Sequence, residues 1–233
     1  MAGSRAVGRW RAGCGRKWGR AVIEIKHRES GKVLHRVEAD SLEGQSLSAL
    51  QLAGANLAGL NLTRVNFRNS DLRNADFTGA QLAGANFYEA SLNGAVLDRV
   101  EAPKAEFTEA VMEGARALNA NFHGAVFRYA RLSQCDFTGA QLGNADLSVA
   151  DLRGVFINAN FSDADVRGSK LSNANLTGAD LNKAKFDGAN LIGANLTNAK
   201  YQPEQLHNAR ATGVIGRRGA VQTAKRAWWQ FWG

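Results

Sequence analysis

The 233-residue chain is 45% apolar and carries 29 Lys and Arg against 21 Asp and Glu, a formal net charge of +8. This composition is typical of a protein with a substantial core, and with no run of 18 apolar residues we expect no membrane span. Two cysteines, Cys14 and Cys135, give neither a disulfide framework nor the ligand spacing of a zinc site, and we expect both to be reduced.

The positive charge is concentrated at the two ends. Residues 1–39 hold ten basic and three acidic side chains, residues 202–233 hold five and one, and residues 40–201 hold fourteen and seventeen. The middle is therefore near −3, between two basic ends. The tryptophans also lie only in the ends, at Trp10, Trp18, Trp228, Trp229 and Trp232.

Residues 1–20 contain six basic residues but no apolar run of signal-peptide length, so we expect a cytoplasmic protein. Basic and aromatic side chains together suit a phosphate backbone with stacked bases, or an anionic membrane surface. The candidate contacts are Arg9, Trp10, Arg11, Lys17 and Trp18. The alternative is a disordered extension, because termini are usually poorly ordered unless they dock.

Residues 21–39 have the pattern of a β-hairpin. Ile23 and Ile25 alternate with charged residues, "RESGK" is typical of a turn, and Val33 and Val37 continue the alternation. We expect this hairpin to cap the N-terminal end of the segment that follows.

Residues 40–202 have a period of five. A large apolar residue recurs from Leu42 to Leu152 and, after a slip of one residue, from Phe156 to Tyr201, giving 33 pentads. A small residue, mostly Ala, stands two positions earlier, so in extended backbone both side chains point to the same side and the polar residue between them points out. Each pentad therefore predicts a short strand followed by a two-residue corner.

The corners include Thr78-Gly79 and Thr138-Gly139, where Gly tolerates the positive φ of a tight turn. Four sides and four corners close a coil of twenty residues, and about eight coils stack at roughly 4.8 Å. Residues twenty apart then lie above one another. One such interior column contains Phe67, Phe87, Phe107 and Phe127.

The repeated motif, as in "ANLAG", "ADFTG", "ANLTG" and "ADLNK", resembles that of the pentapeptide-repeat proteins. The resemblance implies an all-β solenoid, a right-handed quadrilateral parallel β-helix. Some members of that family resemble duplex DNA in size and negative charge and bind DNA gyrase, so the resemblance also implies gyrase as a possible partner. Here, however, charges alternate between coils: Arg116 lies one coil from Asp136, Arg131 from Asp151, Asp165 from Lys185 and Asp180 from Lys200. We expect this alternation to cancel a DNA-like field.

The coil from Leu97 to Leu118 departs from the pattern, with Ala102 and Ala117 in place of Leu or Phe and Pro103 at a corner. It is also acidic. The candidate partner-binding patch consists of Glu89, Asp98, Glu101, Glu106, Glu109 and Glu113. Two interpretations stand, a binding patch at a local bulge and ordinary drift in a tolerant repeat.

Residues 203–233 begin with "QPEQLHNARA", which predicts a short helical segment starting at Pro203, with Leu206 and Ala209 on one face, that covers the last coil. The final "KRAWWQFWG" is basic and aromatic. Its candidate contacts are Lys225, Arg226, Trp228, Trp229 and Trp232. These side chains contact a nucleic acid or a membrane, pack on the last coil, or join two subunits into a homodimer.

No catalytic constellation is visible. The four histidines, His27, His35, His123 and His207, lack the paired spacing of a metal site, and Cys135 stands in the inward Ala column, where a thiol acts as a small apolar filler. We therefore expect no enzyme, cofactor or metal. The leading hypothesis is a non-enzymatic binding scaffold for a protein partner; the alternatives are a DNA gyrase modulator and a membrane or nucleic-acid binder acting through the basic ends.

Overall fold

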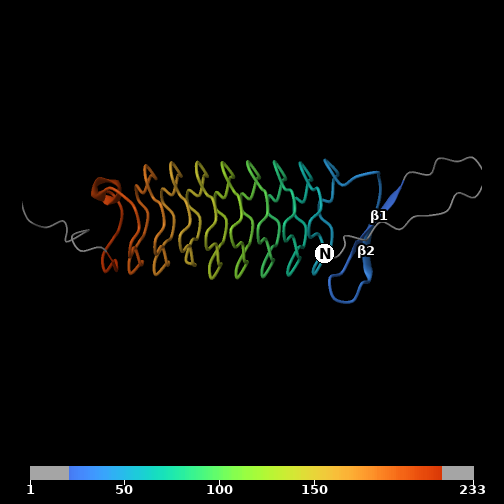
Figure 1. The fold of residues 1–233 in the computed structure, drawn as a ribbon, viewed down its shortest axis with the longest axis horizontal. Helices are drawn as coiled ribbons and strands as arrows, with labels where there is room; N and C mark the ends of the chain where they lie inside the picture. Colours follow the sequence, from blue (N-terminus) through green and yellow to red (C-terminus); the bar gives the residue numbers. More distant parts are fainter. Residues whose placement is uncertain (1–20, 217–233) are drawn as a thin grey trace, which may run out of the picture.

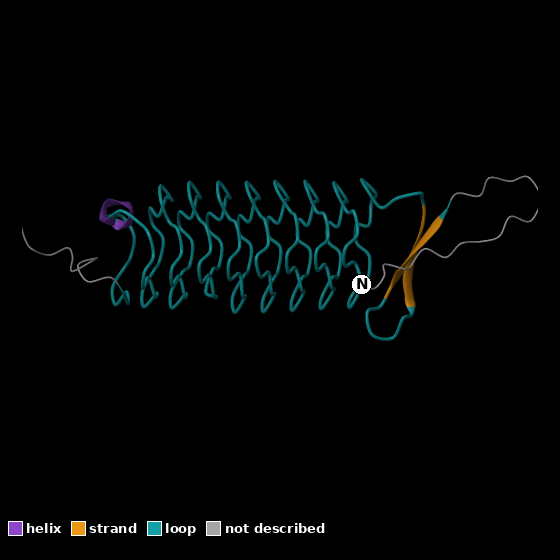
Figure 2. Ribbon diagram, in the orientation of Figure 1, coloured by secondary structure: helices purple, strands orange, loops and turns teal. Residues whose placement is uncertain are grey.

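The structure, a computed structural model, describes residues 21–216. These residues form a rod of stacked coils, with a two-stranded hairpin at the N-terminal end and one turn of helix at the other (Figures 1 and 2). The named elements are β1 (Val22–Lys26), β2 (Val33–Glu38) and the 3₁₀ helix η1 (Pro203–Leu206). No helix within the described range has the length and apolar character needed to cross a membrane.

β1 and β2 pair antiparallel, with Ile25 opposite His35 and a register shift between Ile25 and Lys26. Beyond the shift the chain turns onto the rod, where His27 forms an antiparallel bridge with Ala55. The side chain of Ile25 is 2% exposed and joins the core of the rod. The hairpin is therefore fixed to the first coil by backbone pairing and by one buried side chain.

Each coil pairs in parallel with the next. The polar residue of each pentad forms a bridge with the residue twenty positions later, as Asp76 does with Val96 and Arg116 does with Asp136. The interval falls to nineteen where Asp136 pairs with Val155, and returns to twenty from Val155 to Asn175. The twenty-residue spacing predicted from the pentads is thus the pairing interval of the backbone.

The five residues of a pentad have distinct roles, and we call them the small, polar, large, first corner and second corner residue. In Ala75–Gly79 the small residue donates its N–H to the preceding side and the polar residue to the preceding coil. The large and second corner residues donate to the following coil. The remaining N–H, that of Thr78, donates to Asp76 Oδ1 at 2.9 Å. Asn or Asp in the polar position therefore satisfies the one backbone donor that no carbonyl accepts.

The second corner residue has a positive φ throughout the rod, +66° at Gly79 and +72° at Gly139. Many of these positions are not Gly, and Asn is common among them because it tolerates the left-handed region. Asn and Gly also alternate along a corner: a Cβ added at Gly139 would lie 2.3 Å from Oδ1 of Asn119 in the preceding coil. Glycine is thus required where a neighbouring Asn side chain leans over the corner.

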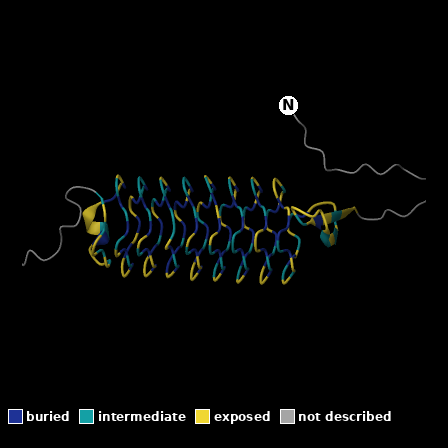
Figure 3. Ribbon diagram, turned by 90° about the horizontal axis from the view of Figure 1, so that it is seen from below, coloured by how far each residue is buried: buried dark blue, intermediate teal, exposed yellow. Residues whose placement is uncertain are grey.

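The large and small residues fill the interior of the rod, and the exposed residues gather at the corners (Figure 3). In the Phe column, ring centroids lie 5.1 Å apart between Phe67 and Phe87 and 4.7 Å apart between Phe87 and Phe107, with nearly parallel planes in the second pair. Phe77, on the adjacent side, meets Phe87 edge-on at 5.8 Å. Stacked and edge-on contacts together stabilise the interior beyond simple area burial.

The coil from Leu97 to Leu118 contains no bulge. The N–H groups of Ala102 and Ala117 donate to the next coil at 2.8 Å, as Leu or Phe does elsewhere. Pro103 occupies the first corner position, where its fixed φ suits the turn and no N–H is needed. The interpretation of a binding patch at a local bulge therefore loses its structural basis, because small inward residues leave the backbone pairing intact.

The frame slip is absorbed at Gly154. Its N–H donates to Leu152 O at 2.9 Å, which closes a tighter turn than the usual corner, and Val155 then pairs with the coil below. A Cβ on Gly154 would lie 2.7 Å from Sγ and 2.8 Å from the carbonyl oxygen of Cys135. The chain omits one corner residue here, and only a residue without a side chain fits so close to the preceding coil.

At the C-terminal end, η1 replaces one side of a coil. The Gln205 side-chain amide donates to Leu181 O at 2.8 Å and to Ala184 O at 2.9 Å, and Leu206 is buried. Parallel pairing then continues into the segment that we predicted to follow the repeat, with bridges to Arg210 and Ile215. The expected helical turn forms at Pro203, but coil pairing resumes after it.

Replacing Phe87 by Ala is expected to lower the free energy of unfolding by about 3–5 kcal/mol, because the cavity lies between two stacked rings. Asn86→Ala removes only the acceptor for the Tyr88 N–H at 2.9 Å and should cost about 1 kcal/mol. Urea denaturation of the two variants checks this difference. Equal losses would show that the inward assignment of Phe87 is wrong.

Replacing Gly154 by Ala is expected to destabilise the rod by about 1–3 kcal/mol through overpacking. Gly143→Ala is the control, since the nearest atom to its added Cβ is 3.3 Å away. Adding Cys135→Ala should not restore stability, because the carbonyl oxygen of residue 135 remains. Thermal unfolding of the three variants measures the effect, and full rescue by the double variant would contradict the backbone clash.

Candidate interaction surface

The six acidic residues of the predicted patch do not lie together. Asp98 is a first corner residue on one side of the coil, Glu101 is a polar residue on the next side, and Glu113 is a first corner residue two sides further on. The remaining three, Glu89, Glu106 and Glu109, share one side and its corner. The structure therefore divides the patch into three separated carboxylates and one group of three.

The separated carboxylates have partners. Asp98 accepts two hydrogen bonds from the Arg116 guanidinium, at 3.1 and 2.6 Å, and Glu113 forms an ion pair with Arg131. Glu101 accepts a hydrogen bond from the side-chain amide of Asn121 at 2.7 Å. The charges of Asp98 and Glu113 are therefore neutralised by arginine, whereas Glu101 keeps its charge and is bound only by a neutral amide.

Two of the group, Glu89 and Glu109, belong to a continuous feature along one corner of the rod, and Glu106 is the polar residue of the adjoining side. Glu89, Glu109, Tyr129 and Val149 are the second corner residues of four successive coils, and we call these four residues the corner ridge. The N–H of each donates to the carbonyl before the next corner residue, at 2.9–3.4 Å, which stacks the four positions at the coil spacing. Within residues 21–216, Glu89, Glu106 and Glu109 form no ion pair.

The second half of the corner ridge is apolar and exposed. The side chain of Tyr129 is 50% exposed and that of Val149 is 47% exposed, with φ of +58° and +61°. A β-branched residue in the left-handed region is an outlier that costs on the order of 1–3 kcal/mol, and such outliers cluster at functional sites. Sequence reasoning missed this pair, although Tyr129 and Val149 are the only large apolar side chains at the second corner positions of the described rod and could have been noticed.

The acidic half of the ridge is bordered by Tyr88. Its hydroxyl donates to Glu109 Oε1 at 3.5 Å, and the Arg68 guanidinium lies 4.5 Å above its ring. The negative charges of Glu109 and Glu89 raise the pKa of Tyr88, because ionising the phenol beside them is unfavourable. Carboxylates, one aromatic hydroxyl and two apolar side chains are thus presented along a single corner.

Elsewhere on the rod the charges are neutralised locally. Arg73, Arg153 and Arg167 each donate hydrogen bonds to the Asp two residues earlier. The distance from an Arg73 guanidinium nitrogen to Asp71 Oδ2 is 2.6 Å. Hydrogen bonding to these arginines is the main cause that lowers the pKa of Asp71, Asp151 and Asp165. Of the stacked pairs predicted from the sequence, only Asp180 with Lys200 is an ion pair, at 3.9 Å.

The other three pairs stack as predicted, Arg116 with Asp136, Arg131 with Asp151 and Asp165 with Lys185, but none of them is an ion pair. Arg116 contacts Asp98 and Arg131 contacts Glu113, both in the preceding coil, because the long side chains reach a corner carboxylate more easily than the residue stacked above. Asp165 is bound by Arg167 within its own pentad. Asn66 and Asn86 also stack, and the side chain of each accepts a hydrogen bond from the N–H group two residues later. Local charge cancellation nevertheless remains.

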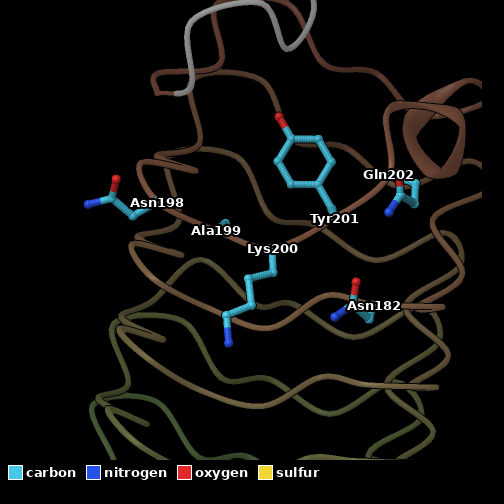
Figure 4. Close-up of a pocket in the computed structure, with 6 residues that line it drawn as sticks. All are labelled: Asn182, Asn198, Ala199, Lys200, Tyr201 and Gln202. Atoms are coloured by element: carbon cyan, nitrogen blue, oxygen red, sulfur yellow. The ribbon is translucent and has the colours of Figure 1, made fainter.

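A recess of about 420 Å³ lies on one side of the last coils (Figure 4). It is lined by Asn182, Asn198, Ala199, Lys200, Tyr201 and Gln202. Its side-chain polar groups are amides, the Tyr201 hydroxyl and one ammonium, and that ammonium already faces Asp180. This lining lacks a nucleophile paired with a base, so the recess offers no catalytic arrangement.

Within residues 21–216, no three His, Cys, Asp or Glu side chains are arranged to hold a metal ion. Cys135 is a free, buried thiol whose pKa is raised by desolvation and by Asp136, so it stays protonated and unreactive. The candidate contacts of both basic ends, Arg9 to Trp18 and Lys225 to Trp232, lie outside the described residues, as does Cys14.

These features define a class, a tandem repeat protein whose coils each use four pentads. The pentapeptide repeats model matches residues 51–87, 80–116, 118–154 and 159–198, in eight copies. The chain belongs to the pentapeptide repeat family. Comparison with curated proteins finds no match.

Several solved structures are similar. HetL, a pentapeptide repeat protein involved in heterocyst differentiation regulation from the cyanobacterium Nostoc sp. strain PCC 7120, is 27% identical, over 73% of this chain and 82% of HetL, with a TM-score of 0.47. Full-length QnrB1, a plasmid-mediated fluoroquinolone resistance protein, is 20% identical over 75% and 90%, with a TM-score of 0.30. A pentapeptide repeat protein of the Arabidopsis thaliana thylakoid lumen is 24% identical over 68% and 72%, with a TM-score of 0.23.

Replacing Val149 by Gly is expected to stabilise the protein by roughly 1 kcal/mol, because Gly adopts the positive φ without strain and the lost side chain is half exposed. The matched change Val111→Gly, at a polar position of the rod, should destabilise it. Urea denaturation of both variants measures the difference. A loss of stability in Val149→Gly would show that the Val149 side chain contributes to packing rather than storing strain.

Replacing Arg153 by Ala is expected to raise the pKa of Asp151 toward its ordinary value, since the side-chain hydrogen bonds from Arg153 lower it. A depressed pKa contributes stability that is present above the ordinary aspartate pKa of about 3.9 and is lost as pH falls below it. The variant should therefore lose less stability on acidification. Carboxyl titration by NMR measures the pKa, and Arg99→Ala, at a corner three coils away, should leave it unchanged.

Proposed function

We propose that this protein is a non-enzymatic, cytoplasmic binding scaffold that uses the corner ridge to contact a protein partner. The rod is a right-handed quadrilateral parallel β-helix of about eight coils, capped by the β1–β2 hairpin and by η1. Parallel pairing at intervals of twenty residues and membership of the pentapeptide repeat family support this form. The observation that carries the binding role is the exposure of Tyr129 and Val149 on adjacent coils.

A tyrosine and an aliphatic side chain at the centre of a rigid surface have the character of an interaction hot spot. Both residues are held in strained backbone that the surrounding pairing enforces, so the ridge needs no ordering before it binds. The rod supplies this rigidity because every side is fixed to the coils before and after it. The favoured partner surface is a shallow apolar groove.

The acidic half of the ridge sets the charge of that partner. Glu89, Glu106 and Glu109 lie beside the apolar pair and are free of ion pairs within the described chain. A groove flanked by Lys or Arg is complementary to them, and such complementarity raises the association rate and excludes acidic partners. Reversing the charges of Glu106 and Glu109, which lie on one side of the rod, therefore perturbs this part of the proposed surface.

The described rod does not favour the alternative of DNA mimicry. Residues 1–20 and 217–233 hold ten basic and no acidic side chains, which leaves 19 basic and 21 acidic residues in the rod. Ten of those 21 carboxylates form ion pairs, nine of them with arginine. A field resembling duplex DNA needs long rows of free carboxylates.

The proposal is tested by site-specific photo-crosslinking in cells, with the photoreactive residue placed at Tyr129 or, as a control, at Asn144, an exposed corner residue of another column. A protein captured from position 129 and not from position 144 is then purified. Tyr129→Ala is expected to weaken its binding to the full chain at least about tenfold, and the Glu106→Arg/Glu109→Arg variant should slow association.

Equal capture from both positions, or unchanged affinity after Tyr129→Ala, would contradict the ridge as the binding surface. The gyrase alternative is tested by a DNA gyrase supercoiling assay, with and without a quinolone, on the natural protein and on Tyr129→Ala. Inhibition or drug protection that survives Tyr129→Ala would place the activity elsewhere on the rod. Binding to nucleic acid or vesicles that is lost with salt and with the basic ends would assign function to those ends instead.

A further inference from the structure

The described residues leave the C-terminal end of the rod open. In interior coils, large and second corner residues donate their N–H groups to the following coil, as Leu191 does to Arg210 O at 2.7 Å. On the last coil, Ala211 and Gly213 hold these two positions, and within residues 21–216 neither donates to a carbonyl. The end thus presents an unpaired strand edge, which folded proteins usually cover.

Apolar residues surround this edge. The side chain of Ile215 is 58% exposed, the largest exposure among the large apolar residues of the described chain. Val214 and Ala209 are half-buried against the core. The last two inward positions hold Ala211 and Gly216, where earlier coils have Leu or Phe, so the interior narrows and ends in small residues. A covering group would gain both apolar contact and backbone pairing here.

The sequence supplies such a group directly after this end. Seventeen residues follow Gly216, and four of the last six are aromatic: Trp228, Trp229, Phe231 and Trp232. Trp228 stands twelve positions beyond Gly216, a reach of up to about 40 Å in extended chain, against a coil side of about 16 Å. We propose that residues 228–232 cover the open C-terminal end of the same molecule.

The dimensions favour this occupant over a second copy of the chain docked end to end. A coil with sides of about 16 Å has a cross-section near 270 Å², whereas stable dimers bury roughly 800 Å² per partner. One or two aromatic side chains, each able to bury about 150–250 Å², are enough to cover this smaller area. The inference concerns the end of the rod alone and does not depend on the corner ridge.

The test uses the full chain and a full-length variant in which Trp228, Trp229, Phe231 and Trp232 are replaced by Ser. Hydrogen exchange followed by NMR should show slow exchange of the Ala211 and Gly213 amides in the natural chain and at least tenfold faster exchange in the variant. The amide of Leu196, which is bonded to Ile215 O at 2.7 Å, is the internal reference for an intact last coil. Trp10→Ser/Trp18→Ser is the matched control and should leave the exchange unchanged.

Equally fast exchange of the two amides in the natural chain and the aromatic variant would overturn the proposal. So would protection that rises with protein concentration together with a doubled mass in sedimentation, since a second copy would then cover the end. Protection in a monomer that is lost only in the aromatic variant supports closure by residues 228–232. Loss of Leu196 protection in the variant would show instead that the segment holds the coil together.

Discussion

The fold depends on a single constraint, that every backbone donor of a five-residue side must find an acceptor inside a rod one coil wide. Pairing with the two adjacent coils and the corner turn satisfies four of the five N–H groups in each pentad. Where the polar residue is Asn or Asp, its side chain accepts from the fifth, as Asp76 does for Thr78, and at Glu113 the acceptor is instead Asn93 of the preceding coil. The repeated motif is therefore a solution to hydrogen bonding as much as to core packing.

This arrangement also decides where function is presented. Asn and Asp side chains on the sides accept hydrogen bonds from their own backbone, and exposed residues are frequent at the corners (Figure 3). A corner residue must tolerate positive φ, which normally selects Gly or Asn. Tyr129 and Val149 depart from that rule at adjacent coils, and their exposure next to unpaired carboxylates distinguishes one corner from the other three. Binding at a corner therefore uses positions where the backbone already limits the choice of residue.

Irregularities in the repeat have different structural consequences. Ala102 and Ala117 shrink the interior without altering the pairing, because the neighbouring large side chains still meet across the core. The slip at Gly154 removes a whole corner residue, and the chain approaches Cys135 so closely that no side chain fits. At the last coil, Ala211 and Gly216 end the interior with small residues, whereas at the N-terminal end the larger side chain of Ile25 is buried in the core. The slip at Gly154 and the small residues of the last coil therefore alter the stacking of coils, whereas Ala102 and Ala117 do not.

The sequence by itself determined the period, the inward columns and the corner positions, because the alternation of Ala, polar and large residues reflects the direction of side chains along a strand. It also indicated the hairpin near Ile25 and the turn at Pro203. Only the tertiary structure decided which charges meet, since arginines such as Arg116 and Arg131 select partners by reach rather than by stacking. It likewise brought Glu109, Tyr129 and Val149 onto one corner, because residues twenty positions apart lie above one another. Asp98, Glu101 and Glu113 are closer in sequence but lie on different sides of a coil.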